Sequence, residues 1–392
     1  MKKILLLFFI VSMASVSDAQ YWIQAGGGAT IDEGMDIASD GFNNTYTTGY
    51  FTSVLTMDNF SLSSAGFQDI FLIKTNSNGY ISWLKRAGGI NIDKALAINS
   101  DINGNILITG LFYGTAEFDG QFITSSGQQD IFIAKYDSAG TLQWVKRAGG
   151  ASADAGNAVT FDNSGNVIVT GEFSGSCTFG TTTLTSFNGT LDVFTAKYDS
   201  NGNFLWVKKG SAKYTDRGTD VSADSIGNIY VSGMFSDTIT FDAQHTNSMY
   251  NAMFLIKYDA AGIEQWFRWI GSGSTNKMGG MSLHDNDINL TGNFTGNLYF
   301  FGNGPMQTLT GIHTNNIFIA RYDLQGNLSW KSSSGSENEI TSEDITTKSN
   351  GEILIAGNFK CRLNDFSDQY GQGVFCSVGF WDTYVASYNN SG

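Results

Sequence analysis

The chain has 392 residues, and its 22 basic and 36 acidic side chains give a net charge of −14. This acidity opposes contact with phosphate backbones, so we do not expect nucleic-acid binding. With 47 glycines, one proline and 14% aromatic residues, the composition favours β-strands joined by many tight turns.

The first 19 residues have the pattern of a secretory signal peptide. Lys2 and Lys3 form a positive n-region, residues 4–16 are apolar, and Ser17 and Ala19 are small residues before a cleavage site. The apolar run is shorter than the about 20 residues of a membrane span. We therefore expect export with cleavage before Gln20, no membrane span in the mature chain, and a place outside the cell, at its surface or in the periplasm.

Tryptophans recur at nearly constant spacing along the mature chain. They stand at Trp22, Trp83, Trp144, Trp206, Trp266 and Trp330, which are 61, 61, 62, 60 and 64 residues apart. After each comes a turn and an apolar run that ends in Gly-x-Phe, such as Gly165–Phe173. A second apolar run, such as Asp130–Asp137, leads through a short turn to the next Trp.

Short apolar runs between turn residues predict antiparallel strands joined by hairpins, four to each repeat. The Ile-Phe-Ile-Ala type of run is apolar on both faces, as a strand between neighbouring sheets would be. Six repeats of about 60 residues and four strands predict an all-β, six-bladed β-propeller. A β-solenoid is the rival architecture, but its coils are shorter.

The two ends of the chain favour closure of the propeller. The last repeat stops at Gly392 without a Trp strand, whereas Gln20–Gly27 has the sequence of that missing strand. We expect the strand of Trp22 to complete the last blade, so that no blade edge stays unpaired. Residues 20–392 would then form one propeller domain, and we expect a monomer.

With these elements the chain resembles the bacterial β-propeller repeat of the SBBP type. The shared elements are Gly-Gly…Asp, Asp-x-x-Gly-Asn-x-x-Val-Thr-Gly and Asp-x-Phe-x-x-Lys-Tyr, and they cover 20–392. The resemblance implies a propeller of extracellular bacterial proteins, with a biochemical role that is largely undefined. The family's name implies seven blades, whereas this chain has six repeats.

A residue that recurs in every blade suits a structural role better than a single active site. Aspartates follow the Gly-Gly turn in four repeats, with Asn276 and Glu339 in the other two; they are Asp32, Asp93, Asp154 and Asp216. They could form an acidic ring for a cation, but capping of local N–H groups is sufficient to explain them.

Basic residues also recur in the second apolar run. They are Lys74, Lys135, Lys197, Lys257 and Arg321. A charge in a buried strand needs a partner, so these residues are predicted to form an inter-blade ion-pair ladder with the ring aspartates.

Calcium is the one cofactor that a sequence motif suggests. Turns such as Asp162–Asn166 have a spacing similar to that of calcium loops, but they lack the later carboxylates and the bidentate Glu. We interpret them as hairpin turns with glycine at positive φ, and expect no cofactor.

Three cysteines cannot form a disulfide framework. Cys361 and Cys376 could pair across a hairpin of the last repeat, which an exported chain permits. Cys177 would then be a small buried apolar residue.

Catalytic motifs are scarce. The three histidines have no metal-binding spacing, and there is no Gly-x-Ser-x-Gly nucleophile elbow. Two carboxylates could still meet at a propeller axis for glycoside chemistry.

Residues that break the repeat are the better candidates for ligand contact, although loops also drift freely. Aromatic, Arg and Lys residues at irregular positions are typical of recognition surfaces. The candidates are Tyr214, Arg217, Arg268, Trp269, Lys277 and Trp381.

The leading hypothesis is a non-enzymatic binding or scaffold protein that presents loops to a protein or glycan at the cell surface. The first alternative is a carbohydrate-active enzyme, a hydrolase or lyase, with carboxylates at the axis. The second is a structural component of a cell-surface assembly.

Overall fold

The structure, a computed structural model, describes residues 24–241, 245–272, 276–302, 304–336, 338–360 and 381–389, with the backbone of four two-residue strands between 362 and 376. The predicted signal peptide, Trp22 and the Cys361–Cys376 pairing lie outside the described residues. The chain divides into two compact units, and strands β18 and β19 fall across the division; the first unit is 1–161, 165–185 and 197–205, and the second is 162–164, 186–196 and 206–392.

From residue 24 to residue 185 every regular element is a strand: β1 (Gly26–Gly27), β2 (Asp32–Ser39), β3 (Thr45–Phe51), β4 (Val54–Met57), β5 (Phe60–Ser63), β6 (Asp69–Thr75), β7 (Ile81–Gly89), β8 (Asp93–Ser100), β9 (Ile106–Phe112), β10 (Thr115–Phe118), β11 (Gln121–Thr124), β12 (Asp130–Tyr136), β13 (Leu142–Gly150), β14 (Asp154–Phe161), β15 (Val167–Ser174), β16 (Ser176–Phe179) and β17 (Thr182–Thr185).

The later elements are a 3-10 turn, η1 (Phe187–Gly189), and further strands: β18 (Leu191–Tyr198), β19 (Phe204–Gly210), β20 (Arg217–Ala223), β21 (Ile229–Thr240), β22 (His245–Tyr258), β23 (Glu264–Ser272), β24 (Asn276–His284), β25 (Asp287–Phe294), β26 (Asn297–Phe301), β27 (Gln307–Thr310), β28 (Asn315–Asp323), β29 (Leu328–Ser336), β30 (Ile340–Thr347), β31 (Ile353–Phe359), β32 (Arg362–Leu363), β33 (Ser367–Asp368), β34 (Gly371–Gln372), β35 (Phe375–Cys376) and β36 (Asp382–Tyr388).

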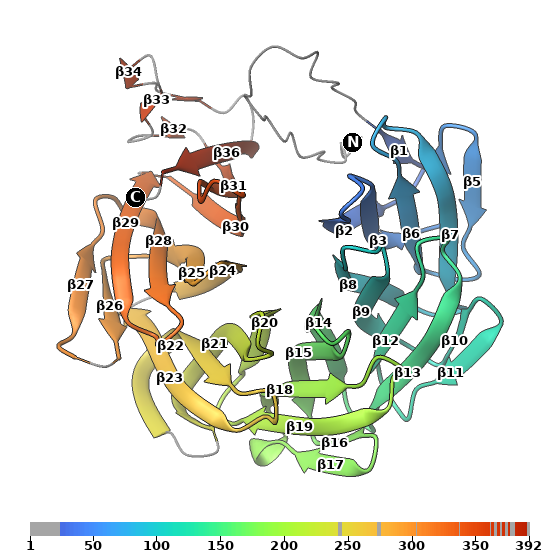
Figure 1. Cartoon of the computed structure of the whole chain (residues 1–392), viewed down its shortest axis with the longest axis horizontal. Coiled ribbons are helices and arrows are strands. Elements are labelled where there is room, and N and C mark those ends of the chain that lie inside the picture. Colours follow the sequence, from blue (N-terminus) through green and yellow to red (C-terminus); the bar gives the residue numbers. More distant parts are fainter. Residues whose placement is uncertain are drawn as a thin grey trace. The chain divides into compact units, whose positions relative to one another are not determined.

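The same four-stranded antiparallel sheet recurs in both units (Figure 1). Its strand orders are β2-β3-β6-β7 and β8-β9-β12-β13 in the first unit, and β20-β21-β22-β23 and β24-β25-β28-β29 in the second. Within each unit the first strands of successive sheets are neighbours, as β2 is of β8 and β24 is of β30. The chain is therefore all-β and propeller-like, and the predicted four-stranded repeat is confirmed for these sheets.

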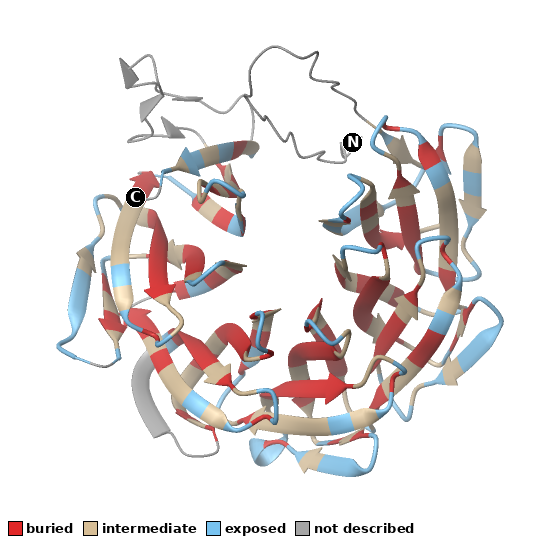
Figure 2. Ribbon diagram, in the orientation of Figure 1, coloured by how far each residue is buried: buried red, intermediate tan, exposed pale blue. Residues whose placement is uncertain are grey.

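Four of the described repeats also contain a small outer hairpin that the sequence prediction missed. Strands β10 and β11 form such a hairpin, and β10 pairs with the end of β7 in the preceding sheet. Hairpins β16–β17 and β26–β27 bind β13 and β23 in the same way. Figure 2 shows their exposed outer strands β11 and β17. The link between repeats is thus partly a shared sheet, and not packing alone.

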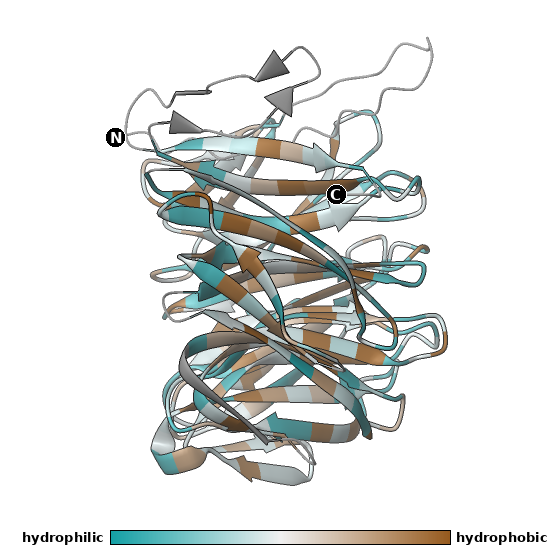
Figure 3. Ribbon diagram, turned by 90° about the vertical axis from the view of Figure 1, so that its left-hand side faces the viewer, coloured by the Kyte–Doolittle hydropathy of each residue, from teal (hydrophilic) through white to brown (hydrophobic). Residues whose placement is uncertain are grey.

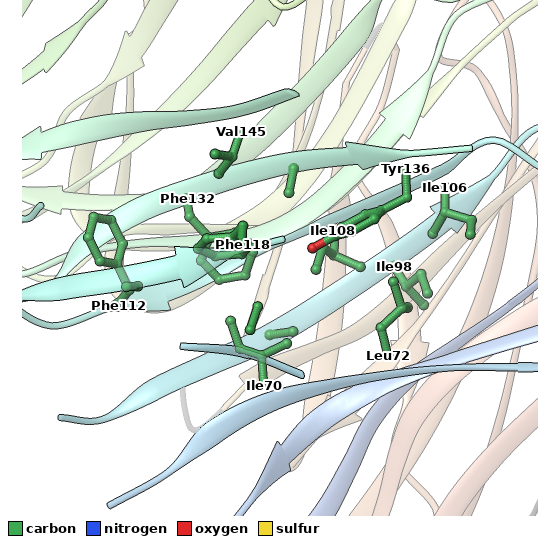
Figure 4. Close-up of a cluster of buried hydrophobic side chains, with 14 of the residues drawn as sticks. Ile70, Leu72, Ile98, Ile106, Ile108, Phe112, Phe118, Phe132, Tyr136 and Val145 are labelled. Carbon is green, nitrogen blue, oxygen red and sulfur yellow. The ribbon is translucent and has the colours of Figure 1, made fainter. Parts of the chain in front are cut away.

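The hydrophobic core lies between neighbouring sheets. Strand β12 is buried at six of its seven residues, in agreement with the expectation of strands that are apolar on both faces. Figure 3 shows the most hydrophobic segments along the strands. The cluster drawn in Figure 4 joins the first two sheets, and its labelled members are Ile70, Leu72, Ile98, Ile106, Ile108, Phe112, Phe118, Phe132, Tyr136 and Val145.

Local polar chemistry forms the turns between strands. The Oδ1 atom of Asp101 accepts hydrogen bonds from Asn103 N and Asn105 N at 2.9 and 2.8 Å, and its Oδ2 accepts one from the Asn105 side chain. Gly104 follows with φ of +81°. The prediction of hairpin turns with glycine at positive φ is confirmed. The turn's own donors occupy both carboxylate oxygens of Asp101.

Four of the repeated tryptophans, Trp83, Trp144, Trp206 and Trp266, bind one sheet to the next. Trp144 Nε1 and Lys135 Nζ each donate to the Ser200 carbonyl at 3.1 Å. Gly202 of the same turn has φ of +78°, and a Cβ there would lie 2.8 Å from the Trp144 indole. Trp83 with Lys74, and Trp266 with Lys257, bind the Ser138 and Leu324 carbonyls in the same way.

The predicted ion-pair ladder is therefore wrong for Lys74, Lys135 and Lys257. Each ammonium group donates to a carbonyl and lies over an aromatic ring, at 5.6 Å for Lys135 above Phe161. Arg321 does meet a carboxylate, but that of Asp287, at 3.2 Å. A backbone carbonyl can satisfy a buried ammonium group without a second buried charge. The lysines therefore do not need the ring aspartates as partners.

Candidate binding site

A pocket of about 560 Å³ lies in the second unit, where the fourth repeat departs from the pattern. This volume falls within the range of about 300–1,000 Å³ that is typical of ligand pockets. Its lining combines aromatic, ammonium, carboxylate and hydroxyl groups, from Phe187, Lys209, Ser211, Ala212, Lys213, Asp237, Thr238, Thr240 and Phe241.

The loop before β18 forms one wall of the pocket. Phe187 N donates to Asp192, five residues on, whereas Ser126 N donates to Asp130, only four residues on. The extra residue forms the 3-10 turn η1 and leaves Phe187 46% exposed. An inserted residue thus places an aromatic ring at the rim.

Asp237 also lines the pocket and has a positive φ. Its φ is +72°, and the corresponding residues of the second and third repeats are Gly114 and Gly175, at +65° and +63°. An L-residue there costs about 1–2 kcal/mol. The equivalent residue of the first repeat, Ser53, has the same conformation, at +68°. The Asp237 carboxylate lies 3.8 Å from Lys213 Nζ.

Lys209 stands where the first two sheets have Arg86 and Arg147. Both arginines contact a buried aspartate at 2.7 Å, whereas Lys209 Nζ lies 3.8 Å from Asp192. Lysine is the shorter side chain, with a point charge instead of the planar fork of arginine. Its ammonium group lies at the pocket wall.

Of the predicted contact residues, Tyr214 lies nearest to this pocket in the chain. It follows the lining residue Lys213, is 52% exposed, and has the Lys213 ammonium 5.0 Å from its ring centre. The hydrogen bond with Tyr214 is the main cause that raises the pKa of Lys213. Arg217 is also exposed, at the start of β20.

Arg268 and Trp269 contact other parts of the protein, and a role in ligand contact stays a prediction for both. Arg268 is 4% exposed, and it donates to the carbonyls of Gly326 and Gln325 in the next sheet at 2.7 and 3.1 Å. The Trp269 ring stacks on Phe301 with centroids 3.7 Å apart. Arg268 joins two sheets and Trp269 joins two strands, so packing explains why these two residues depart from the repeat.

Lys277 and Trp381 are accessible but do not line the pocket. Lys277 Nζ pairs with Glu343 at 2.7 Å, and Trp381 is 47% exposed. The structure therefore does not gather the predicted residues at one site. Sequence reasoning missed Phe187, Lys209 and Asp237, although the insertion and the two replacements are visible when the repeats are compared.

The aspartates after the Gly-Gly turn have the capping role that we favoured. Asp93 accepts from Gly89 N at 2.6 Å and Tyr113 N at 3.1 Å, and Asp154 accepts equivalently from Gly150 N and Ser174 N. Asp32 accepts from Gly28 N and Thr52 N, and Asp216 accepts from Ser236 N. Among the described residues, no three His, Cys, Asp or Glu side chains gather as metal ligands.

Two further carboxylates lie at β-bulges of the first strands in the second unit. Asp220 accepts from Val221 N and Met281 N, and Asp344 accepts from Ile345 N. Desolvation, together with the Asp344 charge, raises the pKa of Asp220 to about 7. Because Met281 belongs to the next sheet, this hydrogen bond joins the first strands of two neighbouring sheets, β20 and β24.

The repeated sheets define the chain as a propeller-like all-β repeat protein. No family model matches it, so the SBBP resemblance gains no support. The chain is 22% identical over 309 residues to an uncharacterized WD repeat-containing protein of Acanthamoeba polyphaga mimivirus, covering 72% of this chain and 19% of that one. It is 29% identical over 172 residues to the regulatory protein FlaEY of Caulobacter vibrioides, covering 43% and 17%. The chain thus spans less than a fifth of either relative.

Two solved structures also match, the first of them a WD40 domain. The Pan2 WD40 domain of Neurospora crassa has a TM-score of 0.37 and 10% identity, with 82% of this chain and 85% of that one covered. Sqt1 from Chaetomium thermophilum has a TM-score of 0.36 and 9% identity, covering 85% and 96%. Within the described residues no helix is long and apolar enough to cross a membrane.

Proposed function

We propose that this chain is an exported, non-enzymatic binding protein that holds a protein or glycan ligand at the pocket of the fourth repeat. The observation that supports this most is the pocket itself, because it lies where an insertion and two replacements coincide. Drift would scatter such changes over the loops, whereas these three line one volume.

The chemistry of the pocket suits a polar ligand with an apolar face. The half-exposed ring of Phe187 lines the pocket, and the half-exposed ring of Tyr214 follows the lining residue Lys213 in the chain. Lys213 with Asp237 offers a donor and an acceptor 3.8 Å apart. Aromatic rings bind the apolar face of a sugar or side chain, and the charged pair binds its hydroxyl or amide groups.

Export is proposed from the n-region and h-region of residues 1–19.

We also propose that six blades close the propeller through the strand of Trp22. Strand β1 pairs with β4 in the same way as the end of β7 pairs with β10, so β1 holds the place of a Trp strand's end. Gln24 donates to Gly79 of the first sheet's turn at 2.6 Å. The sheet β30-β31-β36 has three described strands, and the repeat supplies the sequence around Trp22 as its fourth.

The test compares the native protein with a variant in which the pocket returns to the repeat pattern. Phe187→Ser installs the residue of the second repeat, and Lys209→Arg and Asp237→Gly install those of the second and third repeats, so the fold should be retained. Both proteins are screened on immobilised neutral, acidic and amino-sugar polysaccharides and on cell-envelope proteins. We expect at least a tenfold loss of affinity in the variant for any ligand that the native protein binds.

Lys277→Ala serves as the control, since Lys277 is accessible and does not line the pocket. Equal binding by the native protein and the triple variant would refute the pocket as the site. Release of reducing ends from any polysaccharide would refute the non-enzymatic role and favour a carbohydrate-active enzyme.

A further inference from the structure

Three pairs of buried aspartates recur between successive sheets. In each pair the first member begins the second apolar run and the second follows the Gly-Gly turn of the next repeat. The pairs are Asp69 with Asp93, Asp130 with Asp154, and Asp192 with Asp216, and all six residues are at most 1% exposed. In each pair the charge of the first aspartate raises the pKa of the second.

The first member of every pair has one saturated and one unpartnered oxygen. Asp69 Oδ2 accepts from Ala65 N and Arg86 Nη1 at 2.8 and 2.7 Å, while its buried Oδ1 has no hydrogen-bond partner. Asp130 Oδ1 and Asp192 Oδ1 are equally buried and unpartnered. A buried acceptor without a donor is costly, and more so when it is charged, so a threefold repetition calls for a physical reason.

The unpartnered oxygen of Asp69 faces its neighbour across Gly88. The position of a Cβ on Gly88 lies 2.9 Å from Asp69 Oδ1 and 3.0 Å from Asp93 Oδ2. Both carboxylates therefore border the same small space, which the absent side chain of the glycine leaves open.

The two members of a pair change together along the chain. Where the first aspartate is replaced by Ala252, the second position holds Asn276. Where Asn316 replaces it, the strand register places Ile340 at the second position, and not Glu339 as expected from the sequence. In these two interfaces neither position holds a carboxyl group. The second aspartate is thus retained where it has a carboxyl partner, although capping alone would suit every interface.

We propose that each of these three interfaces holds one shared proton between its two aspartates. The proton makes one carboxyl group a donor and gives the orphaned oxygen its partner, in a short hydrogen bond between an acid and a carboxylate. Two adjacent buried carboxylates cannot both ionise at neutral pH without a large electrostatic cost. One negative charge then remains for each pair.

The surrounding charges agree with this balance. Arg86 faces the first pair, with Glu117 behind it at 3.7 Å. Arg147 and the buried Cys177 face the second pair, and Lys209 with Ser211 faces the third. Each pair thus meets one cation, which matches one remaining negative charge. A metal ion bound to the unpartnered oxygens would lie next to that cation, which is unfavourable because the two positive charges repel.

Burial raises the pKa of the second aspartate, against hydrogen bonds that lower it, to about 6 for Asp93, about 7 for Asp154 and about 8 for Asp216. The pKa values of Asp69, Asp130 and Asp192 are raised too, again first by desolvation. Because the protons are shared, these pKa values belong to each pair as a whole.

The experiment is a pH titration of the full mature chain with ¹³C-labelled aspartate carboxyl groups, followed by NMR. We expect one proton per pair to be released between about pH 6 and 8, far above the usual range of aspartate. Asp130→Asn should bring the titration of Asp154 down toward that usual range, because the like charge is removed. An unchanged titration of Asp154 in this variant would overturn sharing and leave burial as the whole cause.

Two further experiments test the assignment of the proton. The double variant Asp130→Ala with Asp154→Asn copies the Ala252 and Asn276 interface and should lose one high titration while the other two pairs keep theirs. Repetition in choline chloride, NaCl and CaCl₂ identifies a cation site: a titration that moves down when Na⁺ or Ca²⁺ is added would overturn the proton assignment. If the Asp130 variants do not fold, Asp69→Asn tests the first pair in the same way.

Discussion

Replacement of Asp154 by Asn should change how the stability of the protein depends on pH. Asp154 is 1% exposed, and its pKa is raised from 3.8 to about 7. Folding therefore takes up a proton between these values: the unfolded chain has ionised its carboxyl group while the folded chain has not. Stability is highest below about pH 4 for this group and falls as the pH rises toward 7.

The magnitude follows from the proton that is taken up. One proton per molecule changes the unfolding free energy by about 1.4 kcal/mol for each pH unit, so Asp154 should cost the native protein about 2–3 kcal/mol between pH 5 and 7. In the variant this part of the slope should be absent. Asn276 shows that the fold accepts an amide at this position, where its side chain accepts from Ser272 Oγ at 2.8 Å and donates to Asn251 O at 2.6 Å.

The assay is urea unfolding at pH 5, 6 and 7, followed by the fluorescence of the eight tryptophans. Asp285→Asn is the control, because the Asp285 side chain is 85% exposed. Loss of the caps adds an offset that does not depend on pH, and the reasoning allows it in addition to the expected change in slope. Parallel stability curves for the two proteins from pH 5 to 7 would refute it, whatever the offset.

Two predictions concern the contacts that join sheets. Gly202→Ala should lower the unfolding free energy by about 2–4 kcal/mol, since its φ is +78° and its Cβ would lie 2.8 Å from the Trp144 ring; Gly120→Ala, at φ of +83° with open space around it, should lose only about 1–2 kcal/mol. Equal losses in thermal or urea unfolding would show that the indole contact does not matter. Trp22→Ala should destabilise the protein by about 3–5 kcal/mol if its strand completes a blade, as loss of a packed Trp commonly does; a stability within 0.5 kcal/mol of native, the usual effect of a surface change, would exclude that closure.

The repeat made much of the fold predictable. Spacing of Trp83, Trp144 and Trp266, with the apolar runs between them, predicted antiparallel four-stranded sheets without helices, because hairpin turns and period-2 strands are local features. The capping role of Asp93 and Asp154 was predictable for the same reason, since Asx chemistry involves donors a few residues away.

The sequence analysis did not predict hydrogen bonds between side chains and carbonyl groups that are distant in the chain. Arg268 and Lys135 bind carbonyls 58 and 65 residues away, and no local pattern distinguishes such a contact from a surface charge or an ion pair. The outer hairpins were missed because their four-residue strands are too short to show clear periodicity.

The sequence by itself determined the repeat, the strand order within a sheet and the turns, because these depend on neighbouring residues and on a pattern stated six times over. The tertiary structure decided which side chains meet: the pocket between Phe187 and Asp237, the indole clamp on Ser200, and the aspartate pairs. These depend on the packing of one sheet against the next, which brings together groups from different repeats. The pattern marked Asp130 and Asp154 as repeated residues, and only their burial beside one another turned them into a site for a proton.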